Sequence, residues 1–410
     1  MPHYIGILFR GRPIPRPNPR RLFALAAACW LPLLLAPPPS AAAAPRPIEA
    51  YRVTRPGLVL FDPEARAEAL AGMPEGRRRA LCEAGFERWP VHKPVKKVAA
   101  PKDYGGDVRS EPFAWTVMNA AAAAFGLDDG DAREALIANL ERWAKGDALT
   151  RLGNRRPDTY YSLDRTLLPT IVAYGLVREH PDLEKARQKR IHSWLKHLVR
   201  MRGVKRDDDT TGPITDSNNH RYLRDGVTMA WGALVGDDDR FREGIEGYLA
   251  ALADMRRDGS LPLETMRGAR ALWYQRHAIA SLVAIAEMAA VQGYDLYGVD
   301  IEGRSLHRAI RFLVDGIADQ TIVWPYAEAN QSPGPFENYR VQDLSFLAPR
   351  GHGRHYMAWI EAYAARFPDR PESGSLRRQL DEFEPDHRPM IDEYSGGNTS
   401  CFFAPPDDGP

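Results

Sequence analysis

Apolar residues recur at spacings of three and four along most of the chain after Pro45. This period matches one face of an α-helix and predicts helices in ten segments. Those segments are Ala65–Phe86, Phe113–Phe125, Ala132–Trp143, Leu163–Val177, Leu183–Val199, Tyr222–Leu234, Phe241–Met255, Leu263–Val291, Leu306–Ile317 and Tyr356–Phe367. Alternation typical of strands is nearly absent, and Thr321–Trp324 is the best candidate for a strand. The pattern therefore predicts an all-α fold.

The breaks between these segments carry helix stop and start signals, as in Gly126–Gly130 and Gly236–Asp239. The sequence contains no exact repeat, but the succession of helix, short turn and helix continues through the chain. Antiparallel helical hairpins need neighbours that cover their apolar faces. We therefore expect a single α/α toroid, an incomplete α/α barrel, over residues 44–385. An irregular C-terminal tail is expected over residues 386–410.

The first segment has the organisation of a secretory signal peptide. Residues 1–21 contain five arginines and no acidic residue, Leu22–Ala36 is apolar, and small residues follow. An uncleaved anchor is the alternative, but the apolar core is shorter than the ~20 residues that a membrane-spanning helix needs. We expect cleavage after Ala42 or Ala43, so that residues 1–43 form the signal peptide. The mature chain would then be periplasmic or secreted, with no membrane insertion.

The charges of the 410-residue chain nearly balance, with 55 lysines and arginines against 54 aspartates and glutamates. Without the five arginines of the signal peptide, 50 basic residues face the 54 acidic ones. This balance argues against a nucleic-acid partner held by a global positive field. Attraction for an anionic partner then has to be local, from a few placed arginines and lysines.

Three cysteines are too few for a disulfide-scaffolded fold. Two of them, Cys82 and Cys401, remain in the mature chain. In an oxidising compartment they could pair and tie the tail to the first helical region. A buried thiol at Cys82 and a loose thiol at Cys401 are the alternative, and the sequence leaves both open.

Three stretches lack helical periodicity, namely Pro90–Ser110, Asp207–Asn219 and Gln331–Gly353. Long loops on a rigid helical frame often carry binding residues. The first stretch contains four lysines and an aromatic residue, among them Lys102 and Tyr104, and could form a lid over an acidic ligand. A solvated connector is the alternative.

The densest set of candidate residues is the string Asp216–Tyr222. Its Ser, Asp and Asn side chains predict a helix start, because they cap free amide groups. Such a start also offers N–H groups and a partial positive charge to a carboxylate. Asn219 could donate its amide to that carboxylate, and His220 could act as acid, base or donor. A plain helix cap with an exposed histidine is the alternative.

A second set lies in Leu261–His277, where we expect a helix to begin at Pro262. Residues at spacings of three, four and three then fall on one helix face, and these are Arg267, Arg270, Tyr274 and His277. Arg267 and Tyr274 would lie two turns apart, about 10 Å along the axis. Such a polar stripe is costly to bury without a ligand or partners. A solvated face with salt bridges is the alternative.

Together these motifs resemble those of the alginate lyases of polysaccharide lyase family 5. One is Asn-Asn-His-x-Tyr at residues 218–222, and another is Leu-Pro-x-Glu-x-x-Arg-x-x-Arg-Ala-Leu-x-Tyr at residues 261–274. A third, Glu141–Leu149, is similar to the family's Trp-Ala-Lys-Ala-Asp-Ala-Leu stretch. The resemblance spans roughly Leu140–Ala290.

The resemblance implies a periplasmic α/α toroid that cleaves poly-β-D-mannuronate by β-elimination, with catalytic groups at Asn219, His220, Arg267 and Tyr274. Asn219, Arg267 and His220 would neutralise the substrate carboxylate and stabilise the enolate-like state. Tyr274, with its pKa lowered by a neighbouring Arg or His⁺, would take the C5 proton. It could then protonate the C4 leaving oxygen, which lies on the same side of a mannuronate ring.

The family usually has Ser and Trp where this chain has Arg221 and Leu223. Elimination is still expected, but the polymer could be another polyuronate such as polyglucuronate, for which Tyr274 and His220 would divide the base and acid roles. Contacts to the anionic polysaccharide are expected from Arg221, Arg270, His277, Tyr160, Tyr161, Arg155, Lys102 and Tyr104. For the two tyrosines and Arg155 a surface turn is the alternative.

The chemistry implied by the resemblance needs no metal and no cofactor. His352 and His355, in a loop rich in Gly and Arg, are therefore expected to be structural or sugar-binding rather than zinc ligands. We expect a monomer.

Two other functions are compatible with a helical toroid. An inverting glycoside hydrolase would need two separated carboxylic acids, and the acids inside the motifs, Asp225 and Glu264, do not form a recognisable pair. A non-catalytic polyuronate-binding protein would have no need of a base, so the retained Tyr274 argues against it.

Overall fold

A computed structural model describes residues 43–83, 89–99, 109–153, 157–202, 216–331, 335–350, 354–385 and 387–406. All of them belong to one compact unit that begins at Ala41. The expected signal peptide lies outside the described residues except for Ala43. The N–H of Ala43 donates to the carbonyl of Gly298 (2.9 Å), and its carbonyl accepts from the N–H of Asp300 (3.0 Å). The first described residue is therefore held by backbone hydrogen bonds.

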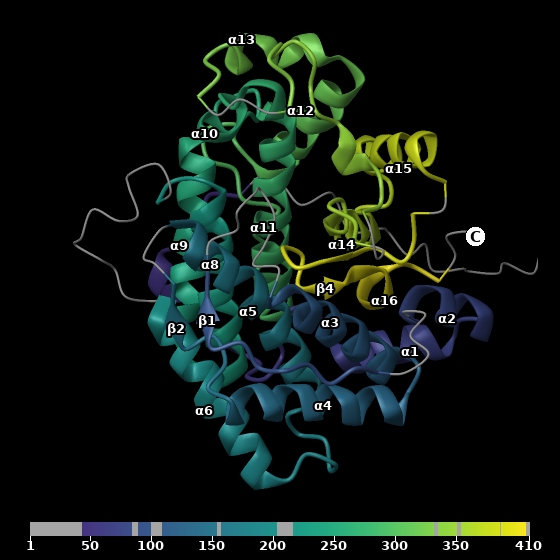
Figure 1. Cartoon of the computed structure of the whole chain (residues 1–410). Coiled ribbons are helices and arrows are strands. Elements are labelled where there is room, and N and C mark those ends of the chain that lie inside the picture. Colours follow the sequence, from purple (N-terminus) through teal and green to yellow (C-terminus); the bar gives the residue numbers. More distant parts are fainter. Residues whose placement is uncertain are drawn as a thin grey trace, which may run out of the picture. The chain divides into compact units, whose positions relative to one another are not determined.

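Helices make up most of the described chain, as the periodicity predicts (Figure 1). The α-helices are α1 (Pro63–Ala71), α2 (Glu75–Cys82), α3 (Glu111–Gly126), α4 (Gly130–Lys145), α5 (Pro157–Val177), α6 (Lys185–Arg202), α8 (Asn219–Val235), α9 (Asp238–Asp254), α10 (Pro262–Thr265), α11 (Ala271–Val291), α12 (Leu306–Ala318), α13 (Trp324–Ala327), α14 (Trp359–Arg366), α15 (Pro371–Phe383) and α16 (Thr399–Phe403). Short 3₁₀ helices are η1 (Ile48–Ala50), η2 (Gly268–Arg270), η3 (Gln320–Ile322) and η4 (Ser345–Leu347).

The helices pack as successive hairpins in two layers (Figure 1). One layer consists of α3, α5, α8 and α11, which contact one another in that order and are buried along most of their length. The other consists of α4, α6, α9 and α12, each packed on the helix before it in its hairpin. Helices α14 and α15 continue the two layers beside α11 and α12. This arrangement is the predicted α/α toroid.

Glycines and acidic residues set the ends of these helices. Helix α3 ends at Gly126, and the side chain of Asp129 caps the start of α4. Helix α8 ends before Gly236, whose φ of +77° lies in the left-handed region that favours glycine, and Asp237 caps α9. Both breaks predicted from the sequence are therefore confirmed.

The predicted helix at Ala65–Phe86 and the predicted strand at Thr321–Trp324 differ from the structure. The segment Ala65–Phe86 holds two helices, α1 and α2, because the chain turns before Pro74, which has no N–H to continue α1. The prediction of a strand at Thr321–Trp324 is wrong, because these residues lie in η3 and at the start of α13. The side chain of Asp319 accepts from the N–H of Thr321 (3.0 Å) and thereby starts a helical turn.

A β-pairing fixes part of the expected lid. Strand β1 (Lys97–Val98) pairs in parallel with β2 (Arg151–Leu152), which follows α4. Lys102 and Tyr104 lie outside the described residues. A lid over a ligand thus stays a prediction for the second half of Pro90–Ser110, whereas the first half is attached to the helical frame.

The C-terminal stretch is ordered and buried, which differs from the expected irregular tail. Strand β3 (Ile391–Asp392) pairs antiparallel with β4 (Gly397–Asn398), and α16 follows. Residues 390–402 are all buried. A disulfide joins Cys82 of α2 to Cys401 of α16, which decides between the two alternatives that the sequence left open.

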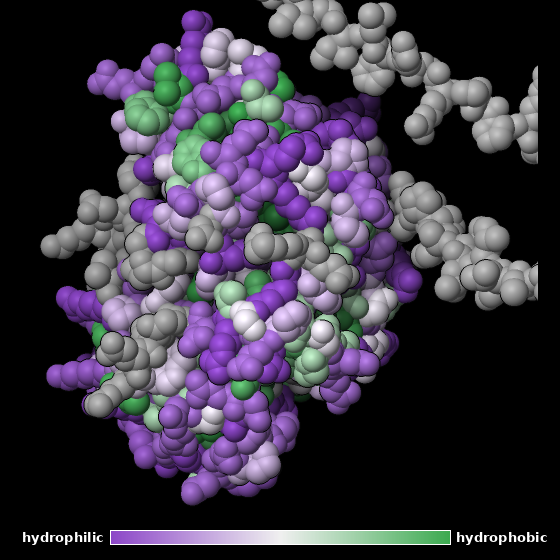
Figure 2. All heavy atoms as spheres, turned by 90° about the vertical axis from the view of Figure 1, so that its right-hand side faces the viewer, coloured by the Kyte–Doolittle hydropathy of each residue, from purple (hydrophilic) through white to green (hydrophobic). Residues whose placement is uncertain are grey.

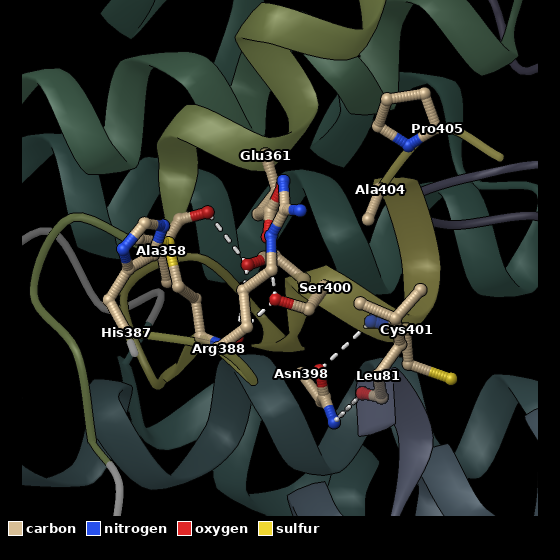
Figure 3. Close-up of polar contacts among 12 residues, drawn as sticks. Leu81, Ala358, Glu361, His387, Arg388, Asn398, Ser400, Cys401, Ala404 and Pro405 are labelled. Carbon is tan, nitrogen blue, oxygen red and sulfur yellow. Dashed lines mark hydrogen bonds and ion pairs between the residues drawn. The ribbon is translucent and has the colours of Figure 1, made fainter. Parts of the chain in front are cut away.

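Polar side chains hold the same stretch from several elements. Arg66 of α1 donates to the carbonyls of Cys401 (2.7 Å) and Ala404 (2.8 Å). Figure 3 shows Asn398 between the carbonyl of Leu81 and the N–H of Cys401, at 3.0 Å from each. In the same view the hydroxyl of Ser400 points to the carboxylate of Glu361, to which it donates (2.6 Å). The stretch is thus a structural part of the toroid.

The face in Figure 2 carries hydrophilic side chains over most of its area, and apolar side chains gather only in small patches. None of the helices in the described part of the chain combines the length and apolarity needed to cross a lipid bilayer.

Candidate active site

The start of α8 brings several polar side chains together. The side chain of Asn218 accepts from the N–H of His220 (3.0 Å), so the predicted helix cap is confirmed. Asn219 is 1% exposed, and its N–H donates to the carboxylate of Glu264 (2.6 Å). Its side-chain amide donates to the hydroxyl of Tyr161 (3.0 Å). The His220 side chain is 18% exposed, so this helix start is more than a plain cap with an exposed histidine.

Tyr161, near the start of α5, connects the two motifs. Its ring stacks on that of His220, with centroids 4.1 Å apart, and its hydroxyl hydrogen-bonds Nε2 of His277 on α11. Burial of the hydroxyl raises the pKa of Tyr161 well above its usual 10, so the phenol keeps its proton at neutral pH. Tyr161 therefore accepts from Asn219 and can donate to His277. Tyr161 was expected to contact the sugar, and in the structure its hydroxyl connects Asn219 to His277 within the protein.

Arg267 and Tyr274 are closer than a continuous helix would place them. Gly268 has a φ of +58°, a left-handed conformation that glycine adopts readily, and the chain turns here between α10 and α11. The prediction that one helix carries both residues about 10 Å apart is therefore wrong. The guanidinium carbon of Arg267 lies 3.6 Å from the centroid of the Tyr274 ring, a cation–π contact.

His277 lies one turn after Tyr274, and their rings are nearly parallel with centroids 6.1 Å apart. The histidine is 6% exposed. Burial lowers its pKa well below the usual 6.5, and the positive charges of Arg276 and Arg165 lower it further. His277 is therefore neutral near pH 7, and the contact with Arg267 is what places a positive charge against Tyr274.

Glu264 lies behind the start of α8 and is fully buried. Burial raises its pKa to about 7, and the charge of Arg267 and the N–H of Asn219 oppose that rise. Only one of its oxygens, Oε1, has a hydrogen-bond partner among the described residues. Glu264 is one of the residues that line a cavity of about 220 Å³, together with Ser217, Tyr222, Asp254, Leu261, Pro262 and Leu263.

The buried C-terminal stretch forms a wall beside these residues. The ring of Tyr394 meets that of His277 edge-on, with centroids 4.1 Å apart. The neighbouring Glu393 accepts from Arg165 (3.1 Å) and from Nε of Arg354 (2.6 Å). The helical periodicity does not predict this wall, and the sequence signal that could have found it is the tail cysteine, Cys401, as a partner for Cys82.

Several expected sugar contacts have protein partners. Nε of Arg221 lies 3.1 Å from the carboxylate of Asp225, and Nε of Arg270 lies 3.4 Å from that of Asp343. Tyr160 is only 4% exposed, a position that does not suit a sugar contact. Their contact with substrate stays a prediction, weakest for Tyr160. The remaining three lie outside the described residues, namely Arg155, Lys102 and Tyr104.

The described histidines do not suggest a metal site. His355 is fully buried, and its Nδ1 accepts from the N–H of Met357 (3.1 Å), a structural role. His352 lies outside the described residues. Within the ranges that the structure describes, no group of three or more His, Cys, Asp or Glu side chains could hold a metal ion.

The part of the chain that carries this cluster is similar to known proteins. Residues 162–323, which hold the start of α8 and the Arg267–Tyr274 pair, match the family model named "Alginate lyase". This stretch of the chain is therefore similar to the alginate lyases. A polysaccharide lyase of Stenotrophomonas maltophilia is 28% identical over 246 residues, which cover 59% of this chain and 66% of that protein. An alginate lyase of Pseudomonas fluorescens is 26% identical over 255 residues, which cover 60% and 62%. The chain thus matches just under two thirds of the length of these relatives.

Solved structures extend the similarity of fold to most of the chain. Alginate lyase A1-III, as a Tyr→Phe variant complexed with a tetrasaccharide, superposes with a TM-score of 0.72. The match covers 89% of this chain and 100% of that one at 23% sequence identity. The same enzyme from Sphingomonas species A1 gives a TM-score of 0.69 at 22% identity, over 90% of this chain. These matches confirm the α/α toroid of the alginate lyases.

Proposed function

We propose that this protein is a periplasmic polysaccharide lyase that cleaves alginate by β-elimination at its mannuronate units. The observation that carries the proposal is the convergence of a phenol with nitrogen donors from two motifs. Asn219 donates to Tyr161, and His220 stacks on its ring. Tyr161 is hydrogen-bonded to His277. The ring of His277 lies beside that of Tyr274, which Arg267 contacts from its face.

The reaction requires that a weakly acidic proton be removed next to a carboxylate. In our proposal Asn219, His220 and Arg267 bind the uronate carboxylate and stabilise the negative charge that develops when C5 loses its proton. Tyr274 takes that proton, the bond from C4 to the glycosidic oxygen breaks, and a C4–C5 double bond forms. The leaving oxygen receives a proton from the same phenol. An amide has two N–H donors, so Asn219 can hold Tyr161 with one and the carboxylate with the other.

Two observations weigh against the alternative of glycoside hydrolysis. The carboxylate of Asp225 accepts from both Arg221 and Arg224 (3.1 Å each). Glu264 has no exposed surface. Hydrolysis needs one acid beside the scissile bond and another that activates water. Asp225 is instead paired with two arginines, and the buried Glu264 accepts from the N–H of Asn219.

The polymer and the compartment are the finer parts of the proposal. Alginate is favoured because the Pseudomonas fluorescens relative is named an alginate lyase, and the structural neighbour complexed with a tetrasaccharide is alginate lyase A1-III. The disulfide between Cys82 and Cys401 favours an oxidising compartment such as the periplasm. The arginine-rich and then apolar first segment favours export in the same way.

The decisive experiment follows the ultraviolet absorbance of unsaturated uronate ends during incubation with polymannuronate, polyguluronate and polyglucuronate. We expect the fastest rise with polymannuronate. Tyr274→Phe should lower the rate at least ~100-fold, because positioned acid–base groups typically contribute 10²–10⁴-fold. The control is Tyr294→Phe, which removes a phenol just beyond the far end of α11, roughly 25 Å along the helix.

The outcomes separate the parts of the proposal. No absorbance rise with any of the three polymers rejects a lyase. A faster rise with polyglucuronate rejects mannuronate as the preferred unit. A Tyr274→Phe rate equal to that of the Tyr294→Phe control rejects Tyr274 as the base.

A further inference from the structure

Helix α6 is strongly basic in a chain whose total charge is nearly balanced. Its 18 residues include seven lysines and arginines and two histidines, and no aspartate or glutamate. The net charge of the whole chain is only +1. Basic side chains concentrated on one helix create a local positive potential that the net charge conceals.

The basic residues on the two sides of α6 differ in whether they form ion pairs. Toward α4, Arg187 and Arg190 both contact the carboxylate of Glu141, at 2.9 and 2.7 Å. Toward α8, Lys196 and Arg200 follow one another at a spacing of four, about 6 Å along the helix. These two side chains are exposed, and neither forms an ion pair with a described residue. One side of the helix is therefore neutralised by structure, and the other presents its charge to solvent.

The charged side borders a pocket of about 370 Å³ between α6, α8 and α9. Its lining includes His192, Lys196 and Arg200 of α6, Trp231 of α8, and Arg240 of α9 with its capping partner Asp237. The rings of His192 and Trp231 lie 5.1 Å apart. The only carboxylate in this lining is 3.3 Å from Nε of Arg240, so it does not offset the two exposed cations.

The electrostatics of His192 agree with an anion-binding pocket. Burial lowers its pKa, and the charges of Lys196 and Arg178 lower it further. The imidazole is then neutral near pH 7 and can exchange hydrogen bonds with hydroxyl groups. A carboxylate for the cations and hydroxyls for the imidazole are the groups that a uronate unit presents, and Trp231 adds an aromatic wall.

We propose that this pocket is a second binding site for the polyuronate chain, separate from the candidate active site. Trp231 lies twelve residues after Asn219 on α8, about 18 Å along the axis. A polymer long enough to reach both sites would be held while one of its units reacts, whereas a short oligosaccharide would use the active site alone. The choice of ligand rests on the proposed function, but the site itself does not.

The test measures binding in the Tyr274→Phe background, where the polymer is not consumed. Isothermal titration with polymannuronate compares Lys196→Glu/Arg200→Glu with the control Lys185→Glu/Lys189→Glu. The control residues are exposed, lie on the same helix at the same spacing and change the charge equally. We expect the affinity for polymer to fall about tenfold or more in the pocket variant and less than twofold in the control. Tetrasaccharide affinity should be unchanged in both, and Lys196→Gln/Arg200→Gln should give an intermediate loss.

Equal losses in the pocket and control variants would overturn the proposal, since general attraction to a basic helix would then explain them. The proposal would also be overturned if the pocket variant lost affinity for vesicles that contain anionic phospholipids but kept its affinity for the polymer. The ligand would then be a lipid phosphate. Selective loss of polymer binding in the pocket variant, together with no turnover by the wild-type protein, supports the pocket and rejects the lyase activity. Normal turnover by the wild-type protein, with no selective loss of polymer affinity in the pocket variant, rejects the pocket and supports the lyase activity.

Discussion

Replacing Glu264 by glutamine should make the stability of the protein depend less on pH. The unperturbed pKa of a glutamate is 4.5, and burial raises that of Glu264 to about 7. The difference corresponds to about 3 kcal/mol at 1.36 kcal/mol per pH unit. Because the folded-state pKa lies above that of the unfolded chain, the contribution to stability is complete below about pH 4.5 and is lost as the pH rises through 7. Glutamine keeps the acceptor for Asn219 and has no proton to lose.

The measurement compares thermal unfolding of the wild type and Glu264→Gln at pH 4 and pH 8. The unit spans 370 residues, so an unfolding entropy of roughly 2.1 cal/mol/K per residue converts 3 kcal/mol into about 4 °C. Relative to wild type, the variant should gain about that much between the two pH values. Glu246→Gln removes one carboxylate from the exposed face of α9 and serves as the control. If the two variants change alike between pH 4 and pH 8, the reasoning about Glu264 is refuted.

Two further predictions concern the bridge at Tyr161 and the packing of the disulfide. Tyr161→Phe keeps the ring on His220 but removes the hydroxyl partner of Asn219 and His277, so kcat should fall roughly 10–100-fold with KM nearly unchanged. Initial rates check this, and a raised KM at constant kcat would instead indicate a sugar contact. A Cβ on Gly126 would lie 2.4 and 2.6 Å from the two disulfide sulfurs, so Gly126→Ala should lower the free energy of unfolding by about 1–3 kcal/mol. Denaturant titration should give a smaller loss in the Cys82→Ala/Cys401→Ala background, and an equal loss would contradict the assigned clash.

The sequence predicted the elements whose limits are set locally. The hairpin turns at Gly126–Gly130 and Gly236–Asp239 carry their own caps, and the helices between them have regular apolar faces. Helix α15 was not predicted, because only Leu376, Leu380 and Phe383 form its apolar stripe. The break between α10 and α11 was missed for a related reason, since a single glycine is tolerated in many helices and does not by itself end one.

What the sequence could not supply was the set of contacts between distant segments. The disulfide partners are 319 residues apart, and Arg66 reaches carbonyls 335 and 338 residues away. The tail sequence, with Gly396-Gly397 between polar residues, has the composition of a loop. Its burial depends on anchors that no local pattern contains, and the tail cysteine was the one sequence signal that pointed to the wall formed by Tyr394.

The order of the two motifs along the chain does not by itself place Asn219 near Tyr274. Two bridges do so, one from the backbone and one from the side chain of Asn219. Glu264 joins the N–H of Asn219 to the segment that carries Arg267, across 45 residues. Tyr161 forms the second bridge. It accepts from the side chain of Asn219, 58 residues away, and it is hydrogen-bonded to His277, 116 residues away on the helix that carries Tyr274. Because each bridge ends on the same asparagine, a change in either one moves the donor amide relative to the phenol, and the geometry of the proposed elimination depends on both.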